Sequence, residues 1–343
     1  MIEKTTLFDV SKAANVSLNT AAKVLAGQAK KARISEKTAK KIKKIATELG
    51  YVPNMMARNL RSKHNRIIGV FIADMADSAY TLSSRIILKQ LHAKGFSPFL
   101  TVAEIGLDLC KQEWLQNRIE GLILCGTTQE MSQDFFNELN KSNIATVIAG
   151  CAFKEPGKSI LESSEVSSVS MNNYTGMQLA IFHLIKQNRK KIAYIDGPQW
   201  HADACERREA YENIIKDHYD PTVISPKTIE PSWKAGYDGT AKLRSISHNY
   251  DAIIAYDDRI AIGSMKWLWE HGKKIPQDIA VVGFDNSPES QSCTPSLTTI
   301  DQPLDIIGQK SVTILENRLY SNNPIEKIQI TPSLVIRRSS LLE

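Results

Sequence analysis

Residues 18–23, Leu-Asn-Thr-Ala-Ala-Lys, carry side chains that are suited to the major groove of DNA. Asn19 offers an amide and Lys23 a cation, whereas Leu18 is apolar. Thr20 adds a hydroxyl between them. Side chains of these types can read base edges when one helix presents them together and buries its opposite face. This chemistry therefore requires a short helix that packs on a neighbour.

The surrounding residues predict two short helices joined by a turn, followed by a third helix. Thr6 and Ser17 are candidate N-caps of the first two helices. Asn15 falls in the turn between them, where Asn tolerates a positive φ better than most residues. A third helix is expected to begin after Ser35, to close a small core with its apolar stripe, and to stop at Gly50.

The charge distribution distinguishes DNA binding from plain packing of amphipathic helices. For two helices with a polar face, plain packing is the more common situation. Here, however, residues 1–66 hold 15 Lys or Arg and 4 Asp or Glu, whereas the rest of the chain holds 28 and 33. The basic excess thus lies entirely at the start of the sequence, as a polyanion-binding module requires.

The segment of residues 51–63 predicts a linker that can fold on DNA. Pro53 suits the first turn of a helix of roughly 8–10 residues, which is too short to be stable alone in water. Leu60 lies between Arg58 and Arg61, and an apolar side chain among cations suits insertion into a minor groove. The alternative is an ordinary linker with one exposed leucine.

The remainder of the chain predicts a two-lobed α/β core. Helical patterns separate nearly all of its apolar runs, which lie at residues 67–73, 121–125, 144–148, 191–195, 252–256 and 279–285. This alternation indicates parallel sheets covered by helices, and its length is sufficient for two such lobes. Ligands of these folds bind at the carboxyl ends of the strands, so a cleft between the lobes is expected to hold one.

Charged residues at those strand ends suit a small polyhydroxy ligand. Asp257 and Asp285 follow two of the runs, and Arg207 follows a third. A carboxylate and a guanidinium can each make two directional bonds to neighbouring hydroxyls. Two simpler interpretations stay open. Asp257 precedes a helix and could be its N-cap, and Arg207 could pair with Glu206 or Glu209.

Several classes of protein are not expected. The five cysteines are an odd number without a Cys-x-x-Cys pair, which predicts reduced cytosolic thiols. No apolar segment follows a basic start and no apolar run approaches the ~20 residues that span a bilayer, so we expect a cytoplasmic protein without a membrane partner. The seven histidines lack metal-ligand spacing, and phosphate-binding loops and nucleophile elbows are missing. We therefore expect no cofactor, no metal and no catalysis.

Three motifs in the first 60 residues occur in a specific order and spacing. They are Leu-Phe-Asp-Val-Ser-x-x-Ala-x-Val-Ser-x-x-Thr-Ala-x-Lys-Val-Leu-x-Gly at 7–27, Glu-Leu-Gly-Tyr-Val-Pro-Asn at 48–54 and Ala-Arg-x-Leu at 57–60. This pattern resembles the lac/gal repressor family of bacterial transcription regulators. The resemblance implies that residues 1–51 are a helix-turn-helix headpiece. It also implies that residues 52–65 are a hinge helix that folds on the operator.

The resemblance implies DNA contacts from both segments. Asn19 would bond to adenine and Leu18 would contact a thymine methyl group, with Leu60 as the minor-groove wedge. Ala22 stands where the family usually has a serine, which removes one expected phosphate contact. The implied DNA-binding residues are Thr6, Leu7, Ser17, Leu18, Asn19, Thr20 and Lys23 in the headpiece and Asn54, Ala57, Leu60 and Arg61 in the hinge.

The core is also similar to this family, which shares its fold with periplasmic sugar-binding proteins. Matching stretches lie at residues 119–123, 172–180, 257–263, 275–285 and 295–300. The implied fold is an α-helical helix-turn-helix headpiece plus an α/β core of two Rossmann-like lobes, periplasmic-binding-protein-like type I. The lobes are expected at residues 66–171 with 299–328 and at 172–298 with 329–343. The implied effector-binding residues are Arg207, Asp285, Phe284, Asp77, Tyr80, Trp233, Tyr256 and Asp257.

Together these patterns predict a DNA-binding transcriptional repressor rather than an enzyme. It is expected to bind a palindromic operator as a homodimer and to respond to a small effector in the cleft. The effector is expected to be a sugar or sugar derivative, and a nucleobase, a sugar phosphate or a sugar acid remain alternatives. A nucleotide-dependent α/β enzyme is the alternative from another class, against which the missing phosphate loop and the basic headpiece count.

Overall fold

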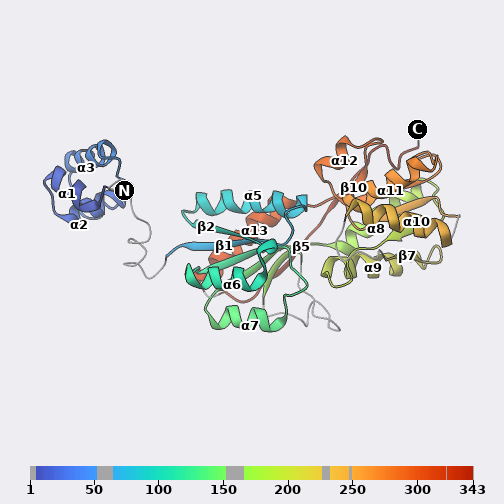
Figure 1. Ribbon diagram of the computed structural model, residues 1–343, viewed down its shortest axis with the longest axis horizontal. Coiled ribbons are helices and arrows are strands. Elements are labelled where there is room, and N and C mark those ends of the chain that lie inside the picture. Colours follow the sequence, from blue (N-terminus) through green and yellow to red (C-terminus); the bar gives the residue numbers. More distant parts are fainter. Residues whose placement is uncertain are drawn as a thin grey trace. The chain divides into compact units, whose positions relative to one another are not determined.

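The computed structural model describes residues 5–51, 65–151, 166–225, 232–246, 249–321 and 323–342. The chain forms two compact units, residues 1–65 and 66–343 (Figure 1). The predicted hinge contacts Asn54, Ala57, Leu60 and Arg61 lie outside the described residues. None of the helices in the described ranges combines the length and the apolar character needed to span a membrane.

The headpiece consists of α1 (Leu7–Ala14), α2 (Leu18–Leu25) and α3 (Glu36–Glu48). The predicted N-caps are confirmed, because Thr6, Ser17 and Ser35 each accept a hydrogen bond from a backbone amide in the first turn. Asn15 has the left-handed backbone expected in the turn, with φ 54° and ψ 52°. The three helices bury one small core, whose members are Val10, Ala14, Ala21, Val24, Ile42 and Ala46.

The first lobe of the core is built on a parallel sheet in the order β11-β5-β4-β3-β1-β2. Its strands are β1 (Ile67–Ile72), β2 (Ser97–Val102), β3 (Gly121–Cys125), β4 (Ala145–Gly150), β5 (Ser167–Met171) and β11 (Lys327–Ile330). Helices α5 (Ser78–Ala93) and α13 (Leu304–Ser321) cover one face, and α6 (Leu107–Gln116) and α7 (Gln133–Lys141) cover the other (Figure 1). A short 3-10 helix, Ala103–Ile105, follows β2. The inner strands β1, β3, β4 and β5 are largely buried on both faces, as the continuous apolar runs predict, whereas the edge strands β2 and β11 are only partly buried.

The second lobe is built on a sheet in the order β12-β10-β9-β8-β6-β7, in which only β12 runs antiparallel to its neighbour. Its strands are β6 (Ile192–Ile195), β7 (Thr222–Ile224), β8 (Ala252–Ala255), β9 (Ala280–Asp285), β10 (Thr298–Asp301) and β12 (Ser333–Val335). Its helices are α8 (Asn173–Lys186), α9 (Ala202–Ile215), α10 (Trp233–Ile246), α11 (Asp258–Glu270) and the short α12 (Pro288–Ser292). On strand β6, Tyr194 stacks on Tyr211 of α9 while Ile195 lies under Gly239 of α10. Successive residues of a strand face opposite sides of the sheet, so α9 and α10 cover opposite faces.

The chain crosses between the sheets slightly later than the sequence predicts. Residues 299–301 were expected in the first lobe, but β10 pairs with β9 and β12 of the second sheet. Residues 329–330 were expected in the second lobe, but β11 extends to Ile330 and pairs with β5. The backbone pairing of the strands decides these boundaries. The sequence could not predict them, because an apolar run alone does not show which sheet it joins.

A pair of glycines fixes the position of α11, whose first turn carries Arg259 and contacts the first lobe. A Cβ atom on Gly263 would lie 1.8 Å from the Trp233 carbonyl oxygen, and one on Gly236 would lie 1.9 Å from the Ile260 carbonyl oxygen. Helices α10 and α11 therefore approach so closely that a side chain at either glycine would force them apart. This close packing holds the N-terminus of α11 in place.

Candidate DNA-binding surface and effector cleft

Helix α2 presents the predicted base-reading residues to solvent. Ala21 and Val24 are buried against the neighbouring helices, which turns the opposite face of α2 outward. On that face Asn19 and Lys23 are exposed, and 41% of the Leu18 surface is accessible. These three side chains are therefore free to enter a groove together.

The other predicted headpiece contacts also hold helix ends in place. The Thr20 hydroxyl lies 2.8 Å from the Ser17 hydroxyl, which in turn accepts a bond from the Thr20 amide. The Thr6 hydroxyl donates to the Asp9 carboxylate at 2.6 Å, and Leu7 packs against the headpiece core. Part of the hydrogen-bonding capacity of Ser17, Thr20 and Thr6 is thus committed to capping, and these residues orient the reading helix.

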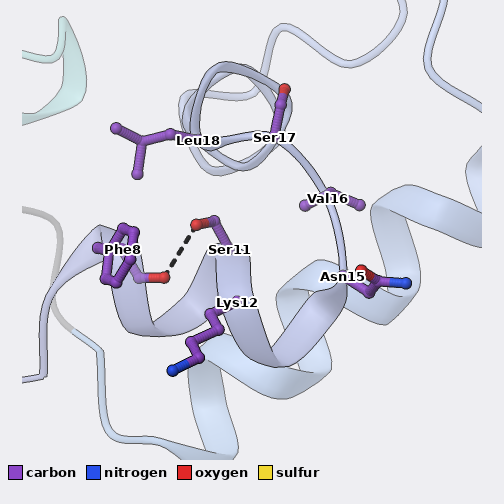
Figure 2. Close-up of a pocket in the computed structure, with 7 residues that line it drawn as sticks. All are labelled: Phe8, Ser11, Lys12, Asn15, Val16, Ser17 and Leu18. Atoms are coloured by element: carbon purple, nitrogen blue, oxygen red, sulfur yellow. Dashed lines mark hydrogen bonds between the residues drawn. The ribbon is translucent and has the colours of Figure 1, made fainter.

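Phe8 is a candidate contact that the sequence analysis missed. Its ring is 63% exposed, and it lies beside Leu18 on a surface hollow of about 590 Å³ between α1 and α2 (Figure 2). A signal for it was available, because Phe8 is two residues before the buried Val10 and thus about 200° around the helix. An exposed aromatic ring next to the reading helix suits an apolar contact with DNA. The hollow is lined by Phe8, Ser11, Lys12, Asn15, Val16, Ser17 and Leu18.

In the core, Arg207 is buried and held on every side. Its Nε donates to Asn173 Oδ1 at 2.8 Å and its Nη1 donates to the Tyr256 carbonyl oxygen at 2.5 Å. Its guanidinium lies between two rings, 4.8 Å from the centroid of Tyr256 and 4.4 Å from that of Phe284. Only 2% of its side chain is exposed. The sequence left open a pairing with Glu206 or Glu209, but the side-chain and backbone partners of Arg207 described above lie on other elements.

Asp285 is the acidic partner of Arg207. One of its carboxylate oxygens lies 3.7 Å from Arg207 Nη2 and accepts a 2.5 Å hydrogen bond from Gln302. Burial raises the pKa of Asp285 to about 7, although Arg207 acts in the opposite direction. The backbone of Asp285 is strained, with φ 104°. Gln302 was missed by the sequence analysis, and it lies directly after strand β10.

Asp257 and Asp77 are helix caps that also bind Arg259. Asp257 accepts from the Ile260 amide at 2.7 Å, so the simpler interpretation from the sequence is correct. Asp77 caps α5 of the first lobe by accepting from the Ala79 amide. Arg259 Nε donates to Asp257 and Arg259 Nη2 donates to Asp77, at 3.1 and 2.9 Å. Arg259 thus joins the two lobes, and nothing in the sequence analysis identified it.

Two tyrosines converge on His201 in the cleft. The Tyr80 hydroxyl of the first lobe lies 2.9 Å from His201 Nε2, and the Tyr256 hydroxyl lies 3.2 Å from His201 Nδ1. Both rings lie on glycines, because a Cβ on Gly126 or Gly197 would be 2.5 Å from Tyr80 or Tyr256 respectively. Burial lowers the pKa of His201, which favours a neutral ring with one donor and one acceptor nitrogen. His201 is a further residue that the sequence analysis missed.

The remaining predicted effector residues lie in different environments. Phe284 is fully buried and backs the Arg207 guanidinium. Trp233 is 54% exposed at the first residue of α10. In the described part of the chain, Trp233 makes no hydrogen bond or ring contact with the other seven predicted effector residues. The structure thus brings together seven of the eight predicted residues and leaves Trp233 apart from them.

The cleft contains more carboxylates than cations. Asp77, Asp257 and Asp285 each place an oxygen within 4.8 Å of the others, which is a spacing that could hold a metal ion. However, Arg207 and Arg259 already lie against these carboxylates and supply positive charge there. The arrangement is suited to directional hydrogen bonds with a polar ligand.

Family models match both units of the chain. Residues 6–54 match the model for bacterial regulatory proteins of the lacI family, and residues 181–340 match a periplasmic binding protein-like domain. The chain thus carries a LacI-family helix-turn-helix domain and a periplasmic-binding-protein-like domain. It is therefore a DNA-binding transcriptional regulator and not an enzyme, and the nucleotide-dependent enzyme considered from the sequence is wrong.

Curated relatives match nearly the whole chain. An HTH-type transcriptional regulator of Lachnoclostridium phytofermentans is 26% identical, with 97% of this chain and 99% of the relative covered. A ribose operon repressor of Halalkalibacterium halodurans is 27% identical, with 98% and 97% covered. The crystal structure of the lac repressor dimer bound to operator and the anti-inducer ONPF has a TM-score of 0.85 at 23% identity, covering 99% of this chain and all of that one. This likeness confirms the predicted fold.

Proposed function

We propose that this LacI-family regulator is a repressor that binds a palindromic operator as a homodimer, under the control of a neutral polyhydroxy effector in the interlobe cleft. The headpiece exposes only a short reading surface, Leu18, Asn19 and Lys23, next to Phe8. One such surface reads too few bases for high specificity, and two-fold symmetry doubles the contacts. The hinge residues Asn54, Ala57, Leu60 and Arg61 remain sequence predictions within this proposal.

Selection of binding sites from random duplexes should test the DNA part of the proposal. We expect an inverted repeat whose half-site centres lie about 10 bp apart or a multiple of it, because two recognition helices must enter successive major grooves. Sedimentation of the complex should give two chains per duplex. A single unrepeated motif bound by one chain would contradict the homodimer.

The observation that carries the effector assignment is the buried pair of Arg207 and Asp285 with its polar neighbours. Arg207 and Asp285 face each other at 3.7 Å, and Gln302 and Asn173 bond to them. Such a set of donors and acceptors suits neighbouring hydroxyl groups. The proposed lobes, with residues 66–171 and 172–298 as their main parts, would each contribute groups to this cleft.

The charge balance of the proposed effector site favours one of the effector classes left open by the sequence. Among the described residues that bond or interact there, five aspartates, Asp74, Asp77, Asp203, Asp257 and Asp285, lie with two arginines, Arg207 and Arg259. An additional anion would be repelled in such surroundings, which disfavours a sugar phosphate or a sugar acid. Tyr256 and Phe284 are both buried with Arg207 against one ring face, so these two rings do not offer a stacking surface for a nucleobase. A neutral sugar fits best.

A thermal-unfolding panel should test the effector class. The probes are D-ribose, D-galactose, D-glucose, D-ribose 5-phosphate, D-gluconate and hypoxanthine, each at millimolar concentration. A neutral sugar present at about 100-fold over its Kd stabilises the folded chain by about 2.7 kcal/mol, which raises the unfolding midpoint by about 5 °C. Stabilisation by the phosphate or the gluconate alone would contradict the charge argument. Stabilisation by hypoxanthine alone would favour the nucleobase alternative.

A further inference from the structure

Arg259 bridges the two lobes with its whole guanidinium. Nη1 donates to Asp74 Oδ2 at 3.0 Å and Nη2 donates to Asp77 Oδ2 at 2.9 Å, both in the segment between β1 and α5 of the first lobe. Nε donates to Asp257 Oδ2 at 3.1 Å within the second lobe. Only 25% of the Arg259 side chain is exposed, so these charge-assisted bonds are partly shielded from water.

A second contact between the lobes lies beside the first. The Tyr80 hydroxyl of α5 meets His201 Nε2 at 2.9 Å, at the residue that precedes α9. The Tyr80 ring cannot move toward the sheet, because it lies over Gly126 and Gly150 at the carboxyl ends of β3 and β4. Asp77 is the N-cap of α5 and Tyr80 lies in its first turn, so the two contacts act on the same helix end.

We propose that these contacts form an interlobe latch, made of Asp74, Asp77, Tyr80, His201 and Arg259, that holds the cleft closed without an effector. This inference rests on the proposed function, since it concerns how the proposed effector site is regulated. Chain crossings also join the lobes, and such connections permit hinge motion. A latch that favours the closed form reduces the apparent affinity of any ligand that must enter through the open form. Arg259 thus sets how readily the site admits its ligand.

The latch can be tested without ligand or DNA by measuring the distance between the lobes. Nitroxide labels are placed at Glu130 and Glu289, two exposed residues that follow strands β3 and β9. Labelling through a non-canonical amino acid avoids Cys205 and Cys293, which are partly accessible. Double electron–electron resonance on the full chain, diluted with unlabelled chain, then reports distances within one molecule.

Arg259→Gln should increase the population with a long interlobe distance about tenfold, because both charge-assisted bonds to the first lobe are lost. Asp77→Asn should also increase the population with a long interlobe distance, because it removes a carboxylate that Arg259 contacts on the first lobe. Asn is as good an N-cap as Asp, so the start of α5 is retained in this variant even if Arg259→Gln folds poorly. The matched control is Arg208→Gln, because Arg208 pairs with Asp196 and Glu212 of its own lobe. The control should keep the wild-type distances.

Wild-type distance distributions in both Arg259→Gln and Asp77→Asn would overturn the latch, as would an equal change in Arg208→Gln. These outcomes are separate from those of the ligand panel. A panel in which no sugar stabilises the chain would contradict the proposed effector and leave the distance measurement unaffected.

Discussion

Replacing Asn19 with alanine should weaken operator binding by about 1–3 kcal/mol per half-site, because a bidentate amide contact to a base edge is lost. Asn19 is exposed on the outer face of α2, and the buried Ala21 and Val24 fix that face outward. In a homodimer the loss occurs twice, which lowers the affinity for a palindromic operator by roughly 30-fold to 20,000-fold. The Ser17 cap is untouched, so the helix itself should remain folded.

Fluorescence anisotropy with the selected operator and with a random duplex measures this effect. Asn19→Ala should leave binding to the random duplex nearly unchanged, because that binding depends on phosphate contacts. Lys44→Ala is a suitable control, since Lys44 is exposed on α3 beside Glu48 and belongs to another helix. It should affect both duplexes alike. Equal losses on both duplexes with Asn19→Ala would show that Asn19 does not read sequence.

Replacing Arg207 with methionine should destabilise the core by about 3–5 kcal/mol at pH 8, because it leaves a buried carboxylate without its counter-charge. The Asn173 side chain and the Tyr256 carbonyl also lose a donor. The same substitution should abolish the thermal shift produced by any stabilising sugar. Arg85→Met is the control, since Arg85 is exposed on α5 and its loss should cost little.

The penalty of Arg207→Met should decrease as the pH falls. Burial raises the pKa of Asp285 from its ordinary 3.8 to about 7, and Arg207 opposes this rise, so its removal raises the pKa further. A carboxyl whose folded-state pKa is raised contributes most to stability below its unfolded pKa, and the contribution is lost as the pH rises through the folded pKa. Urea denaturation at pH 5.5 and pH 8 measures this difference. An equal penalty at both values would show that Asp285 is not the carboxyl left unpaired.

The local signals of the headpiece could be predicted because they depend on neighbouring residues. Thr6, Ser17 and Ser35 cap helices a few residues ahead, and Asn15 adopts its left-handed turn without help from distant parts of the chain. The exposed face of α2 followed from the apolar spacing of Ala21 and Val24. Phe8 was missed because the same spacing was not applied to the outer face of α1.

The cleft could be predicted only in part, because its residues come from strand ends far apart in the sequence. The sequence identified Arg207 and Asp285, yet it left Arg207 with local glutamates as possible partners and did not indicate Gln302. Trp233 was expected beside them and is instead exposed on α10. Sequence spacing does not show which strand ends become neighbours, since the order of strands in the sheet decides this.

The sequence by itself determined the headpiece, the alternating core and the segregation of positive charge, because helix caps, apolar periodicity and composition act over short distances. Only the tertiary structure decided where the lobes meet. Arg259 bonds to Asp74 and Asp77, which are 185 and 182 residues away, and Tyr80 bonds to His201 across 121 residues. No pattern of spacing encodes such pairs, because they exist only once both sheets have formed and their carboxyl ends face each other across the cleft.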